Sequence, residues 1–438
     1  MTEKHNLEKK IKRNIYGKPQ SILILFPPGL SGIARDEAQF ILDHLWFQNK
    51  FTSEITVLKN AVRIDQIHLF AVIELMMRGQ CFTDIRLIIS EGKIANIPAF
   101  EKRCHDIDWE FYLTTAMSLK IKVDVGASAA LHEGAMKEIL THGLANMVSA
   151  MVTGENTEAT TLLHLDVFNH HSIMSISLAG EPLYKRGYRS VLSHSAPLRE
   201  DIAACCLQKA MQFIANNHND FACDNLLVPF SGTGTFLFEY WISRYQFVPA
   251  LFERTYAIQA MPLYRSDHFN YLLKKARENC SIEQLTPANY YCVDSSTSAN
   301  EALLSNIENF KQALEKNQFA WRGTEESKWL LHENFLKIDL AATFTDLSGN
   351  LFMPINPPYG IRFGKSKDTV MLYEHIANKI NELSAILKKR EKHVAGFILC
   401  PGEASWSVFC KTLTGANIDT YHLTQGGLDI RVAQFYTG

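Results

Sequence analysis

Two periods of apolar residues along the chain predict where its strands and helices lie. Between about residues 20 and 180, short runs alternate apolar and polar residues, as half-buried strands do, and longer stretches repeat apolar residues at helical spacing. Strands are predicted over 21–26 and 119–125, helices over 33–45 and 131–151, and a hairpin over 161–168 and 172–178. This mixture predicts an α+β module that contains antiparallel strand pairs.

From about residue 220 onward the pattern changes to apolar runs that alternate with helical stretches. The predicted strands cover 225–229, 290–294, 329–332, 351–355 and 394–399. Strands that alternate with helices predict a mostly parallel, doubly wound sheet with helices on both faces. The fold class is therefore expected to be α/β. We expect an N-terminal module at 1–180, a connecting segment and helix at 181–218, and a second domain at 219–438.

Composition restricts the class of protein. The chain has 438 residues, of which 47% are hydrophobic and 21% charged, so global disorder is excluded. No apolar run approaches the ~18 residues that span a membrane, and the lysine-rich start has no signal-peptide pattern. A cytoplasmic location without membrane association is expected. The formal net charge is −2, so the overall charge does not by itself predict nucleic-acid binding.

The cysteine and histidine patterns predict no metal. The nine cysteines contain no C-x-x-C pair, and the sixteen histidines show no metal-ligand spacing. The adjacent His170 and His171 are expected to be a polar pair on a strand. These patterns predict no oligomeric state.

A glycine-rich turn follows the predicted strand 225–229. The sequence Pro-Phe-Ser-Gly-Thr-Gly-Thr covers residues 229–235 and precedes a helical stretch. Two glycines one residue apart allow a tight turn and a close ligand approach, and the following helix offers unpaired N–H groups. A plain strand-to-helix turn would give the same pattern. Two glycines without a third fit a nucleoside better than a dinucleotide.

Asp294 ends the next predicted strand. A carboxylate at that position can accept hydrogen bonds from both ribose hydroxyls of a nucleoside cofactor. A surface aspartate in a turn is the alternative, and the glycine-rich turn one strand earlier favours the ribose contact.

The sequence Asn-Pro-Pro-Tyr-Gly at 356–360 is the most specific signal in the chain. Two prolines stiffen the loop. The Asn356 side chain and the Pro357 carbonyl offer two fixed acceptors, which suit a planar exocyclic NH2 group, and the Tyr359 ring can stack on the base that carries it. A proline-rich turn with a packed tyrosine is the alternative.

The sequence resembles the class I S-adenosylmethionine-dependent methyltransferases that modify exocyclic amino groups. More narrowly, it is similar to the THUMP-domain RNA methylases, the family of the large-subunit rRNA guanine-N2 methyltransferases, which are often labelled adenine-specific DNA methylases. Besides the Asn-Pro-Pro-Tyr loop, the similar motifs lie at 28–30, 107–113, Ser128 and His132, 183–189, 196–200, 261–262, and 426–431 with Gln434 and Phe435.

The resemblance implies a ferredoxin-like and THUMP RNA-binding module before a Rossmann-like methyltransferase domain. It implies that S-adenosylmethionine contacts the turn and nearby loops, and that the catalytic residues hold a flipped-out base. The implied cofactor-binding residues are Pro229, Ser231, Gly232, Gly234, Thr235, Asp294, Asn334, Phe335 and Asn356. The implied catalytic residues are Asn356, Pro357 and Tyr359, and the RNA-binding residues are Lys185, Arg186, Arg189 and His132.

Among the positions that depart from the family pattern, two concern charged contacts to the cofactor. Val228 stands where relatives usually carry an acid, and Asn334 replaces the aspartate that binds the adenine amino group. The leading hypothesis is methyl transfer to guanine N2 of structured RNA, most specifically rRNA. A catalytically impaired RNA-binding protein and an N6-adenine methyltransferase are the alternatives.

Overall fold

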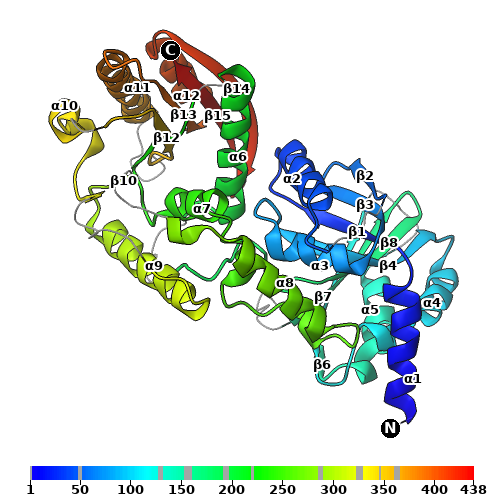
Figure 1. Ribbon diagram of the computed structural model, residues 1–438. Coiled ribbons are helices and arrows are strands. Elements are labelled where there is room, and N and C mark those ends of the chain that lie inside the picture. Colours follow the sequence, from blue (N-terminus) through cyan, green and yellow to red (C-terminus); the bar gives the residue numbers. More distant parts are fainter. Residues whose placement is uncertain are drawn as a thin grey trace. The chain divides into compact units, whose positions relative to one another are not determined.

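The computed structural model describes residues 2–47, 52–126, 132–151, 160–190, 197–218, 221–284, 290–321, 329–344, 347–359 and 366–438 (Figure 1). These residues fall into two compact units. The first comprises Met1–Phe26, Ala34–Lys185 and Glu253–Glu278, and the second comprises Pro27–Ile33, Arg186–Phe252 and Asn279–Gly438. Each unit therefore includes a segment that the sequence order would assign to the other. The motif positions 128, 196 and 360 lie outside the described residues.

The first unit is an α+β unit, as the sequence predicts. Its described strands form one mixed sheet in the order β2-β3-β1-β4-β8-β7-β5-β6. The strands are β1 (Gln20–Leu25), β2 (Glu54–Val57), β3 (Ala61–Ile67), β4 (Asp84–Lys93), β5 (Ser118–Val125), β6 (Ala150–Met151), β7 (Thr160–Phe168) and β8 (His171–Ser177). The helices are α1 (Thr2–Ile11), α2 (Ser31–Asp43), α3 (Leu69–Arg78), α4 (Ile97–His105), α5 (Glu133–Leu144) and α8 (Ser266–Asn279).

The predicted hairpin is present as β7 and β8, which pair antiparallel. Asn169 and His170 connect the strands with positive φ angles of 49° and 60°. Two consecutive left-handed residues match the right-handed twist of the flanking strands, which makes the short turn favourable. The prediction that both histidines lie on a strand is correct for His171, which begins β8, and wrong for His170, which lies in the turn.

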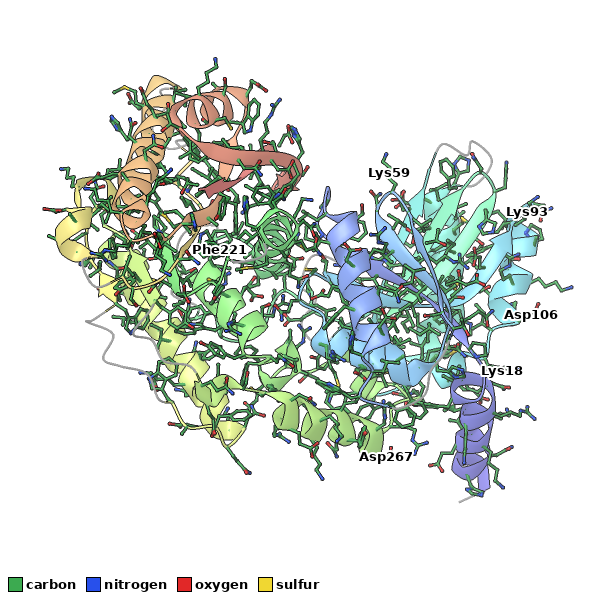
Figure 2. The ribbon with its side chains drawn as sticks, turned by 45° about the horizontal axis from the view of Figure 1, so that its top comes forward. Lys18, Lys59, Lys93, Asp106, Phe221 and Asp267 are labelled. Atoms are coloured by element: carbon green, nitrogen blue, oxygen red, sulfur yellow. The ribbon has the colours of Figure 1, made fainter. Side chains whose placement is uncertain are left out.

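Charged side chains of both signs are mixed over the surface of the first unit. Lys18, Lys59 and Lys93 are exposed, as are Asp106 and Asp267 (Figure 2). This mixture agrees with the near-neutral net charge of the whole chain.

The second unit contains the predicted doubly wound sheet. Its described strands run in the order β11-β10-β9-β12-β13-β15-β14, with parallel pairing from β11 to β13 and antiparallel pairing beyond it. The strands are β9 (Asn225–Pro229), β10 (Tyr290–Val293), β11 (Leu330–Leu331), β12 (Leu351–Ile355), β13 (Val394–Pro401), β14 (Ala416–Gln425) and β15 (Leu428–Thr437). The helices are α6 (Glu200–Asn217), α7 (Thr235–Arg244), α9 (Thr297–Lys316), α10 (Leu340–Thr343), α11 (Ser366–Lys388) and α12 (Glu403–Thr412).

Strand β12 shows why helices cover both faces of this sheet. Leu351, Met353 and Ile355 pack in one cluster with Tyr373 and Ile376 of α11. Phe352 points the other way, with its ring 6.3 Å from that of Tyr240 on α7. Successive residues of a strand face opposite sides, so a strand buried on both faces is apolar throughout. That is why the sequence pattern identified this strand.

The structure corrects one predicted helix. The helix expected over 131–151 is α5, which ends at Leu144, and a 3-10 turn at Ala145–Met147 leads to the short strand β6. The predicted start of that helix at residue 131 lies outside the described residues. None of the helices in the described part of the chain combines the length and the apolar character needed to cross a membrane.

Candidate functional site

Three loops at the carboxyl edge of the second sheet carry the predicted site residues. The glycine-rich turn follows β9, Asp294 follows β10, and Asn356 follows β12. These strands are neighbours in the order β10-β9-β12, and both pairs are parallel. Parallel strands end at the same edge of a sheet, so the three loops lie side by side where α/β folds bind their ligands.

The glycine-rich turn is left-handed at three positions. Phe230, Gly232 and Gly234 have φ angles of 53°, 53° and 84°. A Cβ atom on Gly234 would overlap Leu303 and Phe238, whereas a Cβ on Gly232 would meet nothing within 4 Å. Gly234 is therefore needed for packing, and Gly232 leaves open space in which a ligand can approach the backbone.

Asp294 is joined to this turn by hydrogen bonds. The Gly232 N–H donates to Asp294 Oδ2 at 2.9 Å, and the Ser296 N–H donates to Asp294 Oδ1 at 2.9 Å. Each carboxylate oxygen can accept more than one hydrogen bond. Asp294 is thus fixed in orientation and still has capacity for two further donors, as the paired hydroxyls of a ribose would supply.

The turn residues that flank the glycines are buried. Pro229 ends β9, and Ser231 and Thr235 are 7% and 6% exposed. The Ser231 Oγ is buried and has no hydrogen-bond partner among the described residues. A buried hydroxyl without a partner is costly, so this atom is suited to a ligand group.

The loop after β12 presents a second buried acceptor. Asn356 Oδ1 is buried without a hydrogen-bond partner in the described part of the chain, next to the buried Pro357. The Tyr359 hydroxyl is also buried and has no described partner, and burial raises the pKa of this phenol. A carboxamide oxygen left in this state can accept a hydrogen bond from an incoming NH2 group.

Two predicted cofactor residues have local structural contacts. Asn334 Oδ1 accepts the Leu336 N–H at 3.0 Å and caps the 3-10 turn Phe335–Lys337. Phe335 is 1% exposed in the core, where its ring lies 5.8 Å from that of Phe230. Phe335 therefore packs against Phe230 of the glycine-rich turn.

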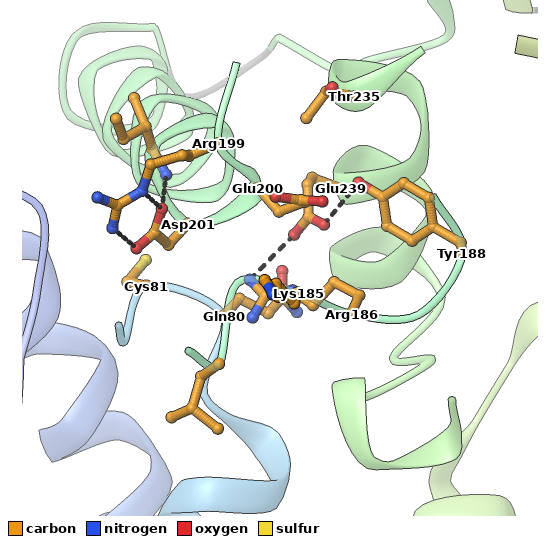
Figure 3. A network of polar contacts seen from close by, with 12 residues as sticks. Gln80, Cys81, Lys185, Arg186, Tyr188, Arg199, Glu200, Asp201, Thr235 and Glu239 are labelled. Atoms are coloured by element: carbon orange, nitrogen blue, oxygen red, sulfur yellow. Dashed lines mark hydrogen bonds and ion pairs between the residues drawn. The ribbon is translucent and has the colours of Figure 1, made fainter. Parts of the chain in front are cut away.

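The structure corrects the expectation that Arg186 contacts RNA. Arg186 is 1% exposed, and its Nη2 lies 3.3 Å from Glu239 Oε2 on α7 (Figure 3). Burial raises the pKa of the Glu239 carboxyl to about 7, and the positive charge of Arg186 acts in the opposite direction. The guanidinium is enclosed in the second unit and is not exposed to a phosphate.

The other predicted RNA contacts differ in exposure. Arg189 is mostly buried and donates from Nε to Glu200 Oε1 at 2.9 Å. The Lys185 side chain is 51% exposed and pairs with Glu181 at 2.9 Å. His132 is exposed at the start of α5. Of these, Lys185 and His132 can contact an external ligand without rearrangement.

Sequence reasoning missed Asn306 on α9. This residue is 1% exposed, donates from Nδ2 to the Thr233 carbonyl at 2.8 Å, and accepts the Ser190 N–H at 2.7 Å. An isolated asparagine in a helix has no sequence signal that separates it from a solvated residue. Only the packing of α9 against the turn reveals it.

A hollow of about 640 Å³ lies elsewhere, in the first unit. Its lining includes Asp124, Asp166, Phe168 and His171. None of the predicted site residues is among the residues that line it. Among the described residues, no group of three or more histidine, cysteine, aspartate or glutamate side chains is arranged to hold a metal ion.

Sequence comparisons match this chain to methyltransferases. Residues 186–395 match the family model UPF0020, described as an RMKL-like methyltransferase domain. The ribosomal RNA large subunit methyltransferase K/L of Legionella pneumophila (strain Lens) is 24% identical over 353 residues, which are 76% of this chain and 46% of that protein. The same-named protein of Acinetobacter baylyi is 28% identical over 201 residues, 45% of this chain and 24% of that protein. The chain thus spans about half or less of these relatives' length.

Solved structures share the fold across the described units. The protein SMU.472, crystallised with S-adenosylhomocysteine, aligns with a TM-score of 0.72 at 18% identity and covers 96% of this chain and 99% of its own. A possible methylase from Clostridium difficile 630 aligns with a TM-score of 0.70 at 16% identity, covering 96% and 98%. The second unit has the class I, Rossmann-like methyltransferase fold. The match to the RMKL-like methyltransferase domain, over residues 186–395, lies in the part of the chain that holds most of this second unit.

Proposed function

We propose that this protein is an S-adenosylmethionine-dependent RNA methyltransferase that modifies an exocyclic amino group. The guanine N2 of rRNA is the target that we favour. The observation that carries this proposal is the adjacency of β10, β9 and β12, which brings Asp294, the glycine-rich turn and Asn356 to one sheet edge. One nucleoside cofactor and one target base can be held there together.

The residues at this edge fit S-adenosylmethionine. Gly232 leaves open space beside the turn, and Asp294 has acceptor capacity for two ribose hydroxyls. Ser231 contributes a buried hydroxyl that lacks a partner among the described residues. Asn334 can still accept a further hydrogen bond, since its Oδ1 has one described donor. S-adenosylmethionine supplies an electrophilic methyl group when it is bound.

Asn356 and Pro357 hold the target amino group. The Asn356 carboxamide oxygen and the Pro357 carbonyl accept its two N–H bonds, which directs the nitrogen lone pair away from these acceptors. As the nitrogen forms its bond to carbon it gains positive charge, and both acceptor dipoles stabilise that charge. Tyr359 stacks on the flipped base. Positioning supplies most of the rate enhancement, and no covalent bond to the protein is required.

The RNA substrate is supported by the relatives, which are named as methyltransferases of the large-subunit ribosomal RNA. The N-terminal unit, expected at residues 1–180 with a connecting segment at 181–218, is proposed as the ferredoxin-like and THUMP RNA-binding module. The exposed Lys185 and His132 are proposed RNA contacts. Neither a metal nor a membrane enters this proposal, and the reaction is assigned to the cytoplasm.

The proposal is tested by calorimetric titration with S-adenosylmethionine and S-adenosylhomocysteine, followed by transfer of labelled methyl groups to undermethylated rRNA, tRNA and DNA. Digestion of the labelled RNA to nucleosides then identifies the base. We expect cofactor binding and label in N2-methylguanosine of rRNA. Label in N6-methyladenosine would contradict the choice of base. RNA binding without cofactor binding would instead identify a catalytically impaired RNA-binding protein.

A further inference from the structure

Residues 186–190, which we call the strap, contact helices α7 and α9. Helix α7 begins at the end of the glycine-rich turn, and α9 contacts this turn through Asn306. Arg186 and the Tyr188 hydroxyl both contact Glu239 of α7, at 3.3 Å and 3.1 Å (Figure 3). The Tyr188 carbonyl accepts from Asn309 Nδ2 of α9 at 3.0 Å. Each of these polar contacts joins the strap to a helix beside the glycine-rich turn.

Two strap residues extend these contacts to both sides of Gly234. Arg189 donates from Nη2 to the Thr235 hydroxyl at 3.3 Å, just after this glycine. The Ser190 N–H donates to Asn306 Oδ1, and Asn306 Nδ2 donates to the Thr233 carbonyl just before it. The turn is therefore hydrogen-bonded to the strap on both sides of Gly234. Asn306 makes the connection on the Thr233 side, and Arg189 makes it on the Thr235 side.

Asn306 is suited to this task because its carboxamide donates and accepts at once. It is 1% exposed, so water cannot replace either hydrogen bond. A buried backbone carbonyl without a donor costs roughly 1–3 kcal/mol. Without Asn306, the Thr233 carbonyl would lose its described donor, and the turn would relax toward arrangements in which that oxygen reaches solvent.

We propose that Asn306 is a positioning residue, which fixes the glycine-rich turn against the strap in its cofactor-binding conformation. The inference rests on the proposed function and adds to it a residue that does not itself touch the cofactor. It also gives the strap motif Arg-Gly-Tyr-Arg a function within the second unit, where the sequence suggests an RNA path. The conformation of the turn then depends on a helix 60 and more residues downstream of it.

The test compares Asn306 of α9 with Asn317, the residue that caps the end of this helix. Asn306→Ala should raise the dissociation constants for S-adenosylmethionine and S-adenosylhomocysteine roughly five- to tenfold, as expected for one lost buried hydrogen bond. Asn317→Ala is the matched control, because Asn317 is buried at the end of α9 and donates to the Leu251 carbonyl at 2.7 Å, away from the turn. It should lose thermal stability and retain affinity. In steady-state assays Asn306→Ala should raise the KM for the cofactor more than it lowers kcat.

Asn306→Asp provides a second test with little change in shape. Its carboxylate can still accept the Ser190 N–H, but it places a negative oxygen against the Thr233 carbonyl. Once protonated, the same carboxyl can donate to that carbonyl. The affinity of Asn306→Asp for S-adenosylmethionine, relative to the unaltered chain, should therefore recover as the pH falls from about 8 to about 6.

Three outcomes would overturn the inference. Asn306→Ala could bind the cofactor as tightly as the unaltered chain, Asn306→Ala and Asn317→Ala could lose affinity equally, or the relative affinity of Asn306→Asp could stay constant with pH. Failure of the proposed function has a different signature. In that case the unaltered chain binds neither S-adenosylmethionine nor S-adenosylhomocysteine, and there is no cofactor for Asn306 to position.

Discussion

The Gly232 amide donates a hydrogen bond to Asp294 Oδ2 at 2.9 Å, so the glycine-rich turn and the end of the neighbouring strand are fixed to each other. The two residues are 62 positions apart in the sequence. Their contact means that the proposed ribose acceptor and the open space beside Gly232 have a fixed separation before any ligand binds. A preorganised site of this kind loses less conformational entropy on binding.

Asp294→Ala should weaken S-adenosylmethionine binding by roughly a hundredfold or more, because it removes two hydrogen bonds to a charged group, which contribute about 1.5–3 kcal/mol each. Calorimetry measures this change directly. Glu301→Ala, at an exposed position on the adjoining helix α9, serves as the control and should bind as the unaltered chain does. Unchanged affinity in Asp294→Ala would move the ribose contact to another residue.

Asn356→Ala should abolish methyl transfer and leave cofactor affinity nearly unchanged. The reason is that Asn356 Oδ1 is assigned to the target amino group. Transfer of labelled methyl groups and calorimetry on the same preparation separate the two effects. If cofactor binding disappears together with transfer, Asn356 contacts the cofactor and its assignment to the base is wrong.

The two glycines of the turn should respond differently to alanine. Gly234→Ala forces a Cβ atom into Leu303 and Phe238 at a φ of 84°, and should cost several kcal/mol of stability, roughly 1–2 from the backbone and 1–3 from overpacking. Gly232→Ala meets no atom within 4 Å, so it should cost only the backbone share, about 1–2 kcal/mol, and mainly reduce cofactor affinity. Thermal unfolding and calorimetry of both variants distinguish these outcomes, and equal stabilities would contradict the packing argument.

Substitutions at the neighbouring residues Arg186 and Lys185 should change different properties. The first should lower the stability of the fold, and the second should alter RNA binding. Arg186→Leu leaves Glu239 buried without its guanidinium partner, and should destabilise the fold by about 3–5 kcal/mol. Lys185→Leu removes a side chain that is 51% exposed, and should change stability by less than about 0.5 kcal/mol while reducing the salt dependence of RNA binding. Urea unfolding and RNA titrations at several salt concentrations check both. An Arg186→Leu protein of normal stability would show that the pair is dispensable for folding.

His164 should make the first unit sensitive to acid. Burial, with the positive charges of Arg86 and Lys122 acting in the same direction, lowers the pKa of this imidazole to about 2 from a usual 6.5. Between these values the unfolded chain binds a proton that the folded chain does not, so stability is complete above about pH 6.5 and falls as the pH decreases. The loss is at most about 1.4 kcal/mol per pH unit.

Urea unfolding at neutral and at mildly acidic pH tests the effect of His164. His164→Gln should flatten the dependence of unfolding free energy on pH, because glutamine does not titrate. His105→Gln, which changes an exposed residue at the end of α4, should retain the slope of the unaltered chain. An identical slope in the unaltered chain and His164→Gln would show that His164 accepts its proton without unfolding.

The fully buried parallel strands β9 and β12 were predictable because burial on both faces makes such strands largely apolar. The β12 segment, Leu-Phe-Met-Pro-Ile, is fully buried, and its predicted and observed bounds agree. The strand β2 was not predicted, because only one of its four residues is even partly buried and its pattern resembles a loop. The helix 131–151 was predicted too long, because its sequence contains no proline and so gives no strong stop signal near Leu144.

The candidate site was predictable where a local motif carries the chemistry, as at Gly232 and Asn356. It was not predictable where the partner is distant in sequence. Arg186 lies in a basic and aromatic segment typical of an RNA contact, yet its partner Glu239 is 53 residues away. Asn306 is one asparagine among several on α9, and its neighbours in the turn are 73 residues earlier.

The exchanged segments limit how this methyltransferase fold can be inherited. The second unit includes Pro27–Ile33, whose Pro28 carbonyl accepts the Thr424 N–H at 3.3 Å, while Glu253–Glu278 leaves it for the first unit. A single recombination event near residue 186 would therefore move an incomplete second unit. The transferred part would lack the segment Pro27–Ile33, which contacts β14. It would also include α8, but without the rest of the first unit to which α8 belongs. The two units are expected to be transmitted, and to diverge, as one gene.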